Sequence, residues 1–271
     1  MSFFELTVPE GGIPVLVEIP HAGLWVPDVV ADELSAPQDA IKRDADIYVD
    51  RLCAHAPDFG AARLAAAVSR YVVDLNRADD DVDTVTVSDH PAPAGVQPRG
   101  VVWRATTDGR PVLKRPLTYQ ALLERLARFY RPYHDALQST LAQLKERHGH
   151  VILLAAHSMP SRGRSLHTDR GAARADIVPG TQGRTTAAAR VIDLVDAHFR
   201  DAGLTVRHDE PYRGGFSTSH YGRPGEGVHA IQIELNRALY VNEQTFEPLV
   251  GDFERLQELL DQLFPKLGRV L

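Results

Sequence analysis

The chain contains the apolar run Val151-Ile152-Leu153-Leu154-Ala155-Ala156, which leads directly into His157 and Ser158. A second run, Ile13-Pro14-Val15-Leu16-Val17-Glu18-Ile19-Pro20, leads into His21. Short apolar runs rich in β-branched residues predict buried strands of a mostly parallel sheet. In open α/β sheets, ligands bind in the crevice outside the carboxyl ends of the strands. Two imidazoles delivered to that edge predict a site, and a metal is the first ligand to consider.

The apolar pattern alternates between strand and helix periods along the chain. Strands are predicted at 13–19, 61–68, 71–75, 150–156, 204–208 and 229–235, and helices at 38–56, 118–147, 184–202 and 243–264. The clearest helix, 118–147, can be capped by Thr118, and Pro132 is expected to kink it. Residues 79–99 are expected to form a long irregular loop, which in a compact domain is usually functional or mobile. Strands that alternate with helices predict an α/β fold: a single domain over residues 1–271, with a mixed, mostly parallel sheet flanked by helices.

Composition narrows the class of protein. The 271 residues carry a net charge of −6 and no basic stripe, which argues against a nucleic-acid partner. No apolar stretch reaches the roughly 18 residues of a membrane helix, and the N-terminus lacks a signal-peptide pattern. Cys53 is the single cysteine, so an intramolecular disulfide is excluded, and its helical apolar setting predicts a core residue. A cytoplasmic protein with a small-molecule substrate is expected, and the oligomeric state stays open.

Three carboxylates lie on or near the start of the helix predicted at 38–56: Asp44, Asp46 and Asp50. Acidic residues are common in a first helical turn, where they interact with the helix dipole. Alternatively, one of them completes a set of two histidines and a carboxylate, the ligand pattern of a catalytic zinc site with an open position for water. The same set can hold Fe(II). Because nothing suggests a site for a 2-oxo acid co-substrate, hydrolytic zinc is favoured.

Two further segments carry candidate polar residues. Asn76 and Arg77 end the segment Asp74-Leu75-Asn76-Arg77, where an amide beside a guanidinium suits capture of a carboxylate, or where the polar residues simply close a turn. Gln232 and Glu234 share one face of an otherwise apolar strand. A glutamate there is either salt-bridged or a general base with a raised pKa. The loop at 213–222 resembles a phosphate loop only weakly, because no Lys-Ser/Thr follows it.

Taken together, the motifs resemble those of the N-formylglutamate amidohydrolases, a family of histidine degradation that is distantly similar to zinc carboxypeptidases and aspartoacylases. The matching segments, in order along the chain, are Ile19-Pro20-His21-Ala22-Gly23, Asp44-Ala45-Asp46 with Val49-Asp50, Ser69-Arg70-Tyr71 leading to Asp74-Leu75-Asn76-Arg77, Arg131-Pro132-Tyr133-His134, Ala156-His157-Ser158, Gly214-Gly215-Phe216, His220-Tyr221-Gly222-Arg223-Pro224 and Gln232-Ile233-Glu234-Leu235.

The resemblance implies a phosphorylase/hydrolase-like α/β fold and a zinc-dependent amidohydrolase that converts N-formyl-L-glutamate to formate and L-glutamate. It implies that His21, Asp46 and His157 bind zinc. Of these assignments, the choice of Asp46 over Asp44 or Asp50 is the least constrained. The remaining roles that it implies are general base for Glu234, stabilisation of the oxyanion for Arg70, and binding of the substrate carboxylate for Asn76 and Arg77.

The chain departs from the family at two places. It has Ile47-Tyr48 where relatives commonly have Trp-His, and Ser219 where they commonly have an arginine before His-Tyr-Gly. Ser219 and His220 are expected to shape the substrate pocket, and loss of that arginine predicts a weaker preference for a glutamate side chain unless Arg104, Arg213 or Arg223 replaces it. The alternatives are a deacylase of another N-acyl amino acid or small peptide, and a non-catalytic binding protein. Glu234 argues against the latter, because binding alone needs no base.

Overall fold

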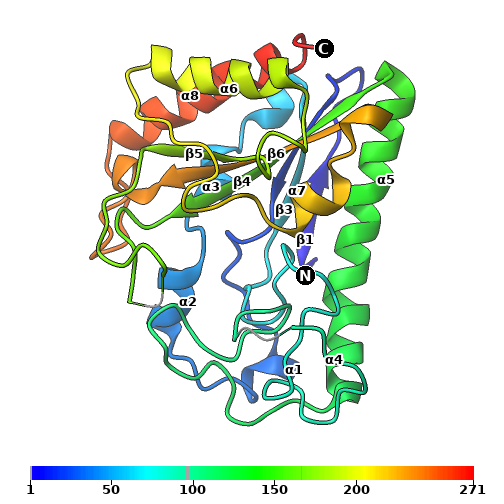
Figure 1. Cartoon of the computed structure of the whole chain (residues 1–271), viewed down its shortest axis with the longest axis vertical. Coiled ribbons are helices and arrows are strands. Elements are labelled where there is room, and N and C mark those ends of the chain that lie inside the picture. The colour runs from blue at the N-terminus through cyan, green and yellow to red at the C-terminus, as the bar shows by residue number, and fades with distance from the viewer. Residues whose placement is uncertain (1, 96–97, 166) are drawn as a thin grey trace.

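The computed structural model describes residues 2–95, 98–165 and 167–271 (Figure 1). One six-stranded sheet has the order β1-β3-β2-β4-β6-β5. Its strands are β1 (Phe4–Thr7), β2 (Val15–Ile19), β3 (Ala62–Ala66), β4 (Val151–Met159), β5 (Ile177–Gly180) and β6 (Val228–Asn236). The four central strands β3, β2, β4 and β6 are parallel, whereas the edge strands β1 and β5 are antiparallel to their neighbours. The predicted mixed, mostly parallel sheet is confirmed.

Helices cover both faces of the sheet. The α-helices are α1 (Asp28–Ala31), α2 (Gln38–Asp44), α3 (Val49–Leu52), α4 (Tyr119–Arg125), α5 (Arg131–His148), α6 (Ala189–Asp201), α7 (Phe216–Tyr221) and α8 (Asp252–Leu267). Short 3₁₀ helices span Ala56–Phe59, Pro224–Glu226 and Arg237–Leu239, and a π turn spans Leu126–Tyr130. Helices α6 and α8 pack on one face, and the long α5 lies on the other, where it contacts β2 and β4 (Figure 1).

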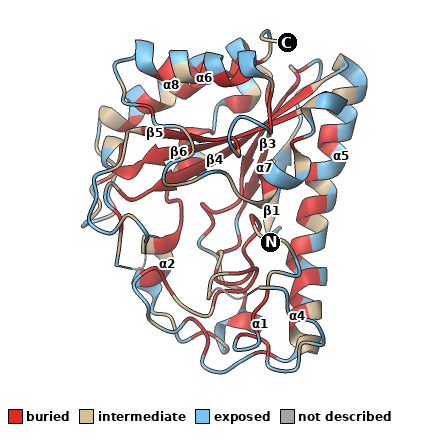
Figure 2. Cartoon of the chain, in the orientation of Figure 1, coloured by how far each residue is buried: buried red, intermediate tan, exposed pale blue. Residues whose placement is uncertain are grey.

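The central strands are buried on both faces. Every residue of β2, β3 and β4 is buried, as the red strands of Figure 2 show. One hydrophobic cluster joins the sheet to α6 and α8, and a second joins it to α5 and the loops between β3 and α4. This two-sided burial explains why β2 and β4 appear in the sequence as continuous apolar runs and not as an alternating pattern.

The helix predicted at 38–56 is interrupted. Helix α2 ends at Asp44, the chain is extended at Ala45, and α3 starts only at Val49. Tyr48, just before α3, has a φ of 66°, in the left-handed region that a continuous helix does not visit. The backbone N–H of Asp46 donates to the carbonyl of His21 instead of to a helical neighbour, at 2.9 Å. This contact holds Asp46 at the end of β2. The prediction of an uninterrupted helix over 38–56 is therefore wrong.

Other predicted elements differ in detail. The segment at 71–75, predicted as a strand, is a turn. Its apolar side chains are buried among the loops that precede α4, and its backbone pairs with no strand of the described residues. The segment at 204–208 forms only an isolated bridge, between Val206 and Ile177. The helix predicted at 118–147 is present, but a π turn separates α4 from α5 directly before Pro132, which cannot donate a helical N–H bond. The last helix begins at Asp252, later than the predicted 243.

Two smaller predictions can also be compared with the structure. Residues 79–95 and 98–99 contain neither a helix nor a strand, as expected, while 96–97 lie outside the described residues. Cys53 is buried in the core on the α8 side. Within the described ranges, no helix is both long enough and apolar enough to cross a membrane.

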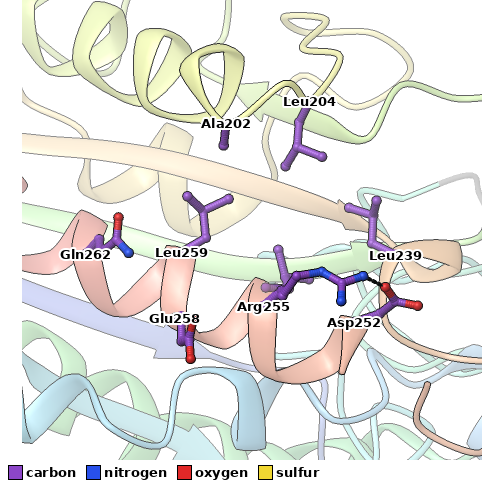
Figure 3. A pocket seen from close by; sticks show the side chains of 9 residues that line it. Ala202, Leu204, Leu239, Asp252, Arg255, Glu258, Leu259 and Gln262 are labelled. Atoms are coloured by element: carbon purple, nitrogen blue, oxygen red, sulfur yellow. Dashed lines mark hydrogen bonds and ion pairs between the residues drawn. The ribbon is translucent and has the colours of Figure 1, made fainter. Parts of the chain in front are cut away.

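A cavity of about 370 Å³ lies between the end of α6 and α8 (Figure 3). Leu204, Leu239 and Leu259 line it together with Ala202, and Asp252 forms an ion pair with Arg255 at its side. None of the residues that the sequence singles out lies there, and its lining holds no histidine. The candidate chemistry belongs to a different cavity, at the carboxyl ends of the central strands.

Candidate active site

Two histidines and one aspartate converge at the ends of β2 and β4. His21 lies two residues beyond the end of β2, His157 lies in the last third of β4, and Asp46 comes from the break between α2 and α3. The two Nδ1 atoms of the histidines are 3.2 Å apart. Asp46 Oδ2 lies 2.9 Å from Nδ1 of His157 and 3.5 Å from Nδ1 of His21. All three side chains are buried, so the sequence-predicted set is brought together.

The spacing of these three atoms fits a tetrahedral metal. Ligand atoms roughly 2.0–2.1 Å from a tetrahedral zinc lie about 3.3 Å from one another, and the separations of 2.9, 3.2 and 3.5 Å bracket this value. Nε2 of His21 is 2.7 Å from Oδ1 of Asp74. A carboxylate bound to the far nitrogen is the usual partner of a metal-binding histidine, because it fixes the ring and leaves the near nitrogen free.

Asp46 is held as an anion. Burial alone would raise the pKa of its carboxyl group, but the hydrogen bonds from His157 and His21 outweigh burial and hold this pKa well below its usual range. Arg237 donates to the carbonyl of Ala45 at 2.6 Å and approaches Asp46 Oδ1 at 3.4 Å. This buried guanidinium therefore fixes the chain segment that carries Asp46 and compensates its charge.

The other two candidate carboxylates are engaged elsewhere. Asp44 accepts hydrogen bonds from Tyr71 Oη at 2.6 Å, from the backbone of Thr107 at 2.9 Å and from Arg164 at 2.9 Å. Asp50 lies on α3 and belongs to neither the three-residue cluster nor the cavity lining. Of the three alternatives left open by the sequence, Asp46 alone has its carboxylate beside the histidines.

Glu234 faces the same cluster from the adjacent strand. It is the register partner of His157 in the parallel pair of β4 and β6. Its side chain is buried and accepts a hydrogen bond from Gln232 Nε2 at 2.8 Å. Burial raises the pKa of Glu234 to about 7, against the opposing charge of His157. A carboxyl group with a pKa near neutrality is suited to accept and return a proton.

Asn76 is fixed by hydrogen bonds on both sides of its amide. Its Oδ1 accepts from the backbone N–H of Ser217 at 2.8 Å, and its Nδ2 donates to Gln232 Oε1 at 3.1 Å. The Nδ2 atom also lies 3.2 Å from Nε2 of His157. The amide thereby ties the segment at 74–77 to α7 and to β6, and the adjacent Arg77 is placed in the cavity wall.

Arg70 is anchored by Asp74. Its Nη2 donates to Asp74 Oδ2 at 2.7 Å, while Nη1 lies 4.0 Å from Asp46. Trp103 donates from its indole nitrogen to the same oxygen of Asp74 at 2.9 Å. Asp74 therefore positions both Arg70 and His21, a role that the sequence argument missed although its Asp-Leu-Asn-Arg segment was noted.

These side chains line a polar cavity of about 260 Å³. Its walls are formed by His21, Asp46, Arg70, Asn76, Arg77, His157, Ser158, Pro211, Tyr212, Arg213, Gly214, Gly215, Gln232 and Glu234. The volume suits a small polar molecule, and the positive side chains favour an anionic one. Sequence patterns did not indicate Tyr212, because a single aromatic residue in a loop carries no periodic signal.

Ser219 and His220, which were expected to shape the substrate pocket, do not line this cavity. Both side chains are exposed on the second half of α7, and Ser219 Oγ donates to the carbonyl of Gly215 at 3.0 Å. The cavity is reached instead by Gly214 and Gly215, before the helix begins, because α7 turns its later residues outward.

Of the three arginines considered as replacements for the missing family arginine, only Arg213 lines the cavity. Arg104 forms an ion pair with Asp83 at 3.2 Å. Arg223 donates to backbone carbonyls within and after α7. Arg213 lines the cavity, but it is exposed.

Comparison with known proteins places this arrangement in a family. A model of the N-formylglutamate amidohydrolase family matches residues 13–241. The chain is 32% identical to an N-formylglutamate deformylase of Pseudomonas aeruginosa over 242 residues, which covers 88% of this chain and 86% of the relative. It is 31% identical over 241 residues to an N-formylglutamate deformylase of Pseudomonas putida, with 88% and 85% covered.

A solved structure agrees with this assignment. The crystal structure of an N-formylglutamate amidohydrolase from Ralstonia eutropha superposes with a TM-score of 0.88 at 32% identity, covering 99% of this chain and 97% of that one. The expected resemblance is confirmed over nearly the whole length, including both strands that deliver the histidines. The chain belongs to the N-formylglutamate amidohydrolase family, whose members are hydrolases of an amide bond.

Proposed function

We propose that the protein is a zinc-dependent amidohydrolase that cleaves N-formyl-L-glutamate to formate and L-glutamate. The observation that carries the proposal is the convergence of His21, Asp46 and His157 within 4.8 Å, with Glu234 buried on the neighbouring strand. The curated relatives are N-formylglutamate deformylases, which supports this substrate. Histidine degradation is the metabolic setting that the family resemblance implies.

The donor set supports zinc as the metal. Two imidazoles and one carboxylate, with room for a fourth ligand, are the usual donors of a catalytic zinc site. Bound there, zinc would supply Lewis acidity, polarising the formyl carbonyl and lowering the pKa of water. His21, Asp46 and His157 would hold it, and Asp74 would keep the ring of His21 in the required orientation.

The protein's own groups supply proton transfer and charge stabilisation. Glu234, with a pKa of about 7, takes a proton from the attacking water and delivers it to the departing amine. Arg70 lines the same cavity and is held by Asp74, so its guanidinium is available to stabilise the oxyanion that forms on the carbonyl oxygen. Since Asp74 fixes this side chain beforehand, little reorganisation is needed during the reaction.

Substrate binding is assigned to the cationic wall. Arg77 lines the cavity beside Asn76, and we assign it to the α-carboxylate of the amino acid. A planar guanidinium binds a carboxylate through two parallel hydrogen bonds, which fixes both distance and orientation. The formyl group is then directed toward the two histidines and Glu234.

The test is a substrate panel combined with metal analysis. Purified protein should contain about one zinc per chain, as a three-ligand site requires, and should release formate from N-formyl-L-glutamate. N-acetyl-L-glutamate, N-formyl-L-methionine and a formylated dipeptide serve as comparisons. Faster turnover of one of these would replace the proposed substrate. Metal binding without turnover of any of them would indicate a non-catalytic binding protein.

A further inference from the structure

The guanidinium of Arg99 lies close to the cavity wall, and no carboxylate among the described residues pairs with it. Arg99 is half-buried in the loop between β3 and α4, and among the described residues its guanidinium forms neither an ion pair nor a hydrogen bond. Arg70, by contrast, is paired with Asp74, and Arg104 with Asp83. An arginine withdrawn from water without a counter-charge is costly unless a ligand supplies one.

Trp103 connects Arg99 to the cavity wall. The guanidinium carbon of Arg99 is 5.7 Å from the centre of the Trp103 ring, and that of Arg70 is 4.4 Å from the same centre. The ring itself is held by its hydrogen bond to Asp74. Arg99 therefore contacts the same aromatic ring as Arg70, which lines the cavity, and this ring limits the freedom of Arg99 before any ligand binds.

The local electrostatics favour an anion at this place. Burial lowers the pKa of Arg99, and the nearby positive charges of Arg70 and Arg77 lower it further, against the opposing influence of Tyr212 and Asp44. The carboxylates of the cavity and its surroundings are already engaged: Asp46 with the histidines, Glu234 with Gln232, and Asp74, behind the wall, with Arg70 and His21. Positive charge therefore exceeds negative charge on the side of the cavity near Arg77 and Arg99. A second carboxylate on the substrate would be stabilised there.

We propose that Arg99 binds the side-chain carboxylate of the dicarboxylic substrate while Arg77 binds its α-carboxylate. This inference rests on the proposed function and extends it to the choice of amino acid. Two carboxylates then meet two guanidiniums that form no ion pair with any carboxylate among the described residues. The side-chain charge is recognised from the loop at 98–104 and not from α7, where Ser219 faces solvent. We therefore expect the enzyme to keep its preference for a glutamate side chain, in place of the weaker preference expected from Ser219.

The test compares two substrates that differ in one charge. N-formyl-L-glutamate and N-formyl-L-glutamine have side chains of nearly the same shape. In Arg99→Gln, kcat/KM for N-formyl-L-glutamate should fall about 100-fold, because a two-bond charged contact is lost. The same variant should change kcat/KM for N-formyl-L-glutamine by less than about threefold, since that amide gains little from a cation. The loss should appear mainly in KM.

Two further variants control the result. Arg99→Lys keeps the charge without the planar fork and should keep part of the preference for glutamate. Arg213→Gln removes the exposed arginine of the cavity wall and tests the competing reader of the side-chain carboxylate: the inference predicts a smaller change in the ratio of the two substrates than in Arg99→Gln. Melting temperatures of all variants are compared with that of the wild-type protein, so that a folding defect is separated from a binding defect.

The outcomes distinguish the inference from the proposed function. If Arg99→Gln lowers kcat/KM for both substrates equally, or if Arg213→Gln alone changes their ratio, the role of Arg99 is wrong while the deformylase activity stands. If Arg99→Gln is unstable, the ratio measured in Arg99→Lys decides, and an unchanged ratio overturns the inference. A wild-type enzyme that hydrolyses neither substrate overturns the proposed function and this inference with it.

Discussion

His157 and Glu234 are direct register partners across the parallel strands β4 and β6. Because paired residues of parallel strands present their side chains on the same face of the sheet, the imidazole and the carboxylate are directed to one side. The candidate site is therefore built on two central strands whose residues, apart from Val228, are all buried. A site on buried central strands holds its groups more accurately than one on loops alone.

Replacement of Glu234 by glutamine tests this partnership. Glu234→Gln keeps the shape of the side chain and removes its basicity, so kcat should fall by roughly 10² to 10⁴, the usual contribution of a positioned base. Zinc content should be unchanged. Glu18→Gln is a matched control, because Glu18 is also a buried carboxyl group of a central strand but does not line the cavity. Equal losses of kcat in both variants would refute the assignment of the base.

Metal content separates the two neighbouring aspartates. Asp46→Asn should lose most of its zinc, because one of three protein ligands is gone, whereas Asp44→Asn should retain it. His220→Ala, at an exposed position on α7, serves as a control that removes an imidazole without touching the cavity. Elemental analysis after extensive dialysis gives the stoichiometry. Retention of zinc by Asp46→Asn together with its loss from Asp44→Asn would reverse the ligand assignment.

Asp44 should instead contribute to stability. The hydrogen bonds of Thr107 and Tyr71 outweigh burial and lower the pKa of Asp44 to about 2. A folded-state pKa below the unfolded value stabilises the protein above the unfolded pKa, and this stability is lost as the pH falls toward 2. Linkage gives about 2 kcal/mol at pH 7. Urea unfolding of metal-depleted protein should show Asp44→Asn less stable by about this amount, and an unchanged midpoint would contradict it.

The contribution of Glu18 to the free energy of unfolding should depend on pH in the opposite direction. Burial raises its pKa to about 7, although Ser217 donates a hydrogen bond to Oε1 at 3.0 Å. A folded-state pKa above the unfolded value stabilises the protein at low pH, and this stability is lost as the pH rises through 7. Between pH 6 and pH 8, the free energy of unfolding should therefore fall by about 1 kcal/mol more in the wild-type protein than in Glu18→Gln. Parallel pH profiles of the two proteins would show that Glu18 does not titrate in this range.

Sequence patterns predicted the parts of the site that lie on regular elements. His21 and His157 follow or end buried apolar strands, and Glu234 interrupts another with a polar side chain. The strand order then brings these side chains together, because β2, β4 and β6 are consecutive in the sheet. The approximate positions of these three side chains followed from alternation and from the carboxyl-end rule for ligand sites.

The other parts of the fold and of the candidate site depend on contacts between distant residues, which no local sequence pattern encodes. The break that frees Asp46 is created by its bond to the carbonyl of His21 and by the support of Arg237, which comes from a distant part of the chain. The turn at 71–75 contains apolar residues that a strand would also contain, but they are buried among loops. Asp74 and Trp103 acquire their roles only when the chain folds back on itself.

The most direct test of the account is formate release from N-formyl-L-glutamate, measured in the wild-type protein and in Glu234→Gln at equal, experimentally determined zinc content. The account predicts steady turnover by the wild-type protein and a loss of roughly 10² to 10⁴ in kcat in the variant, with about one zinc per chain in both. Turnover that persists in the variant, or a wild-type protein that binds zinc and releases no formate, would contradict it.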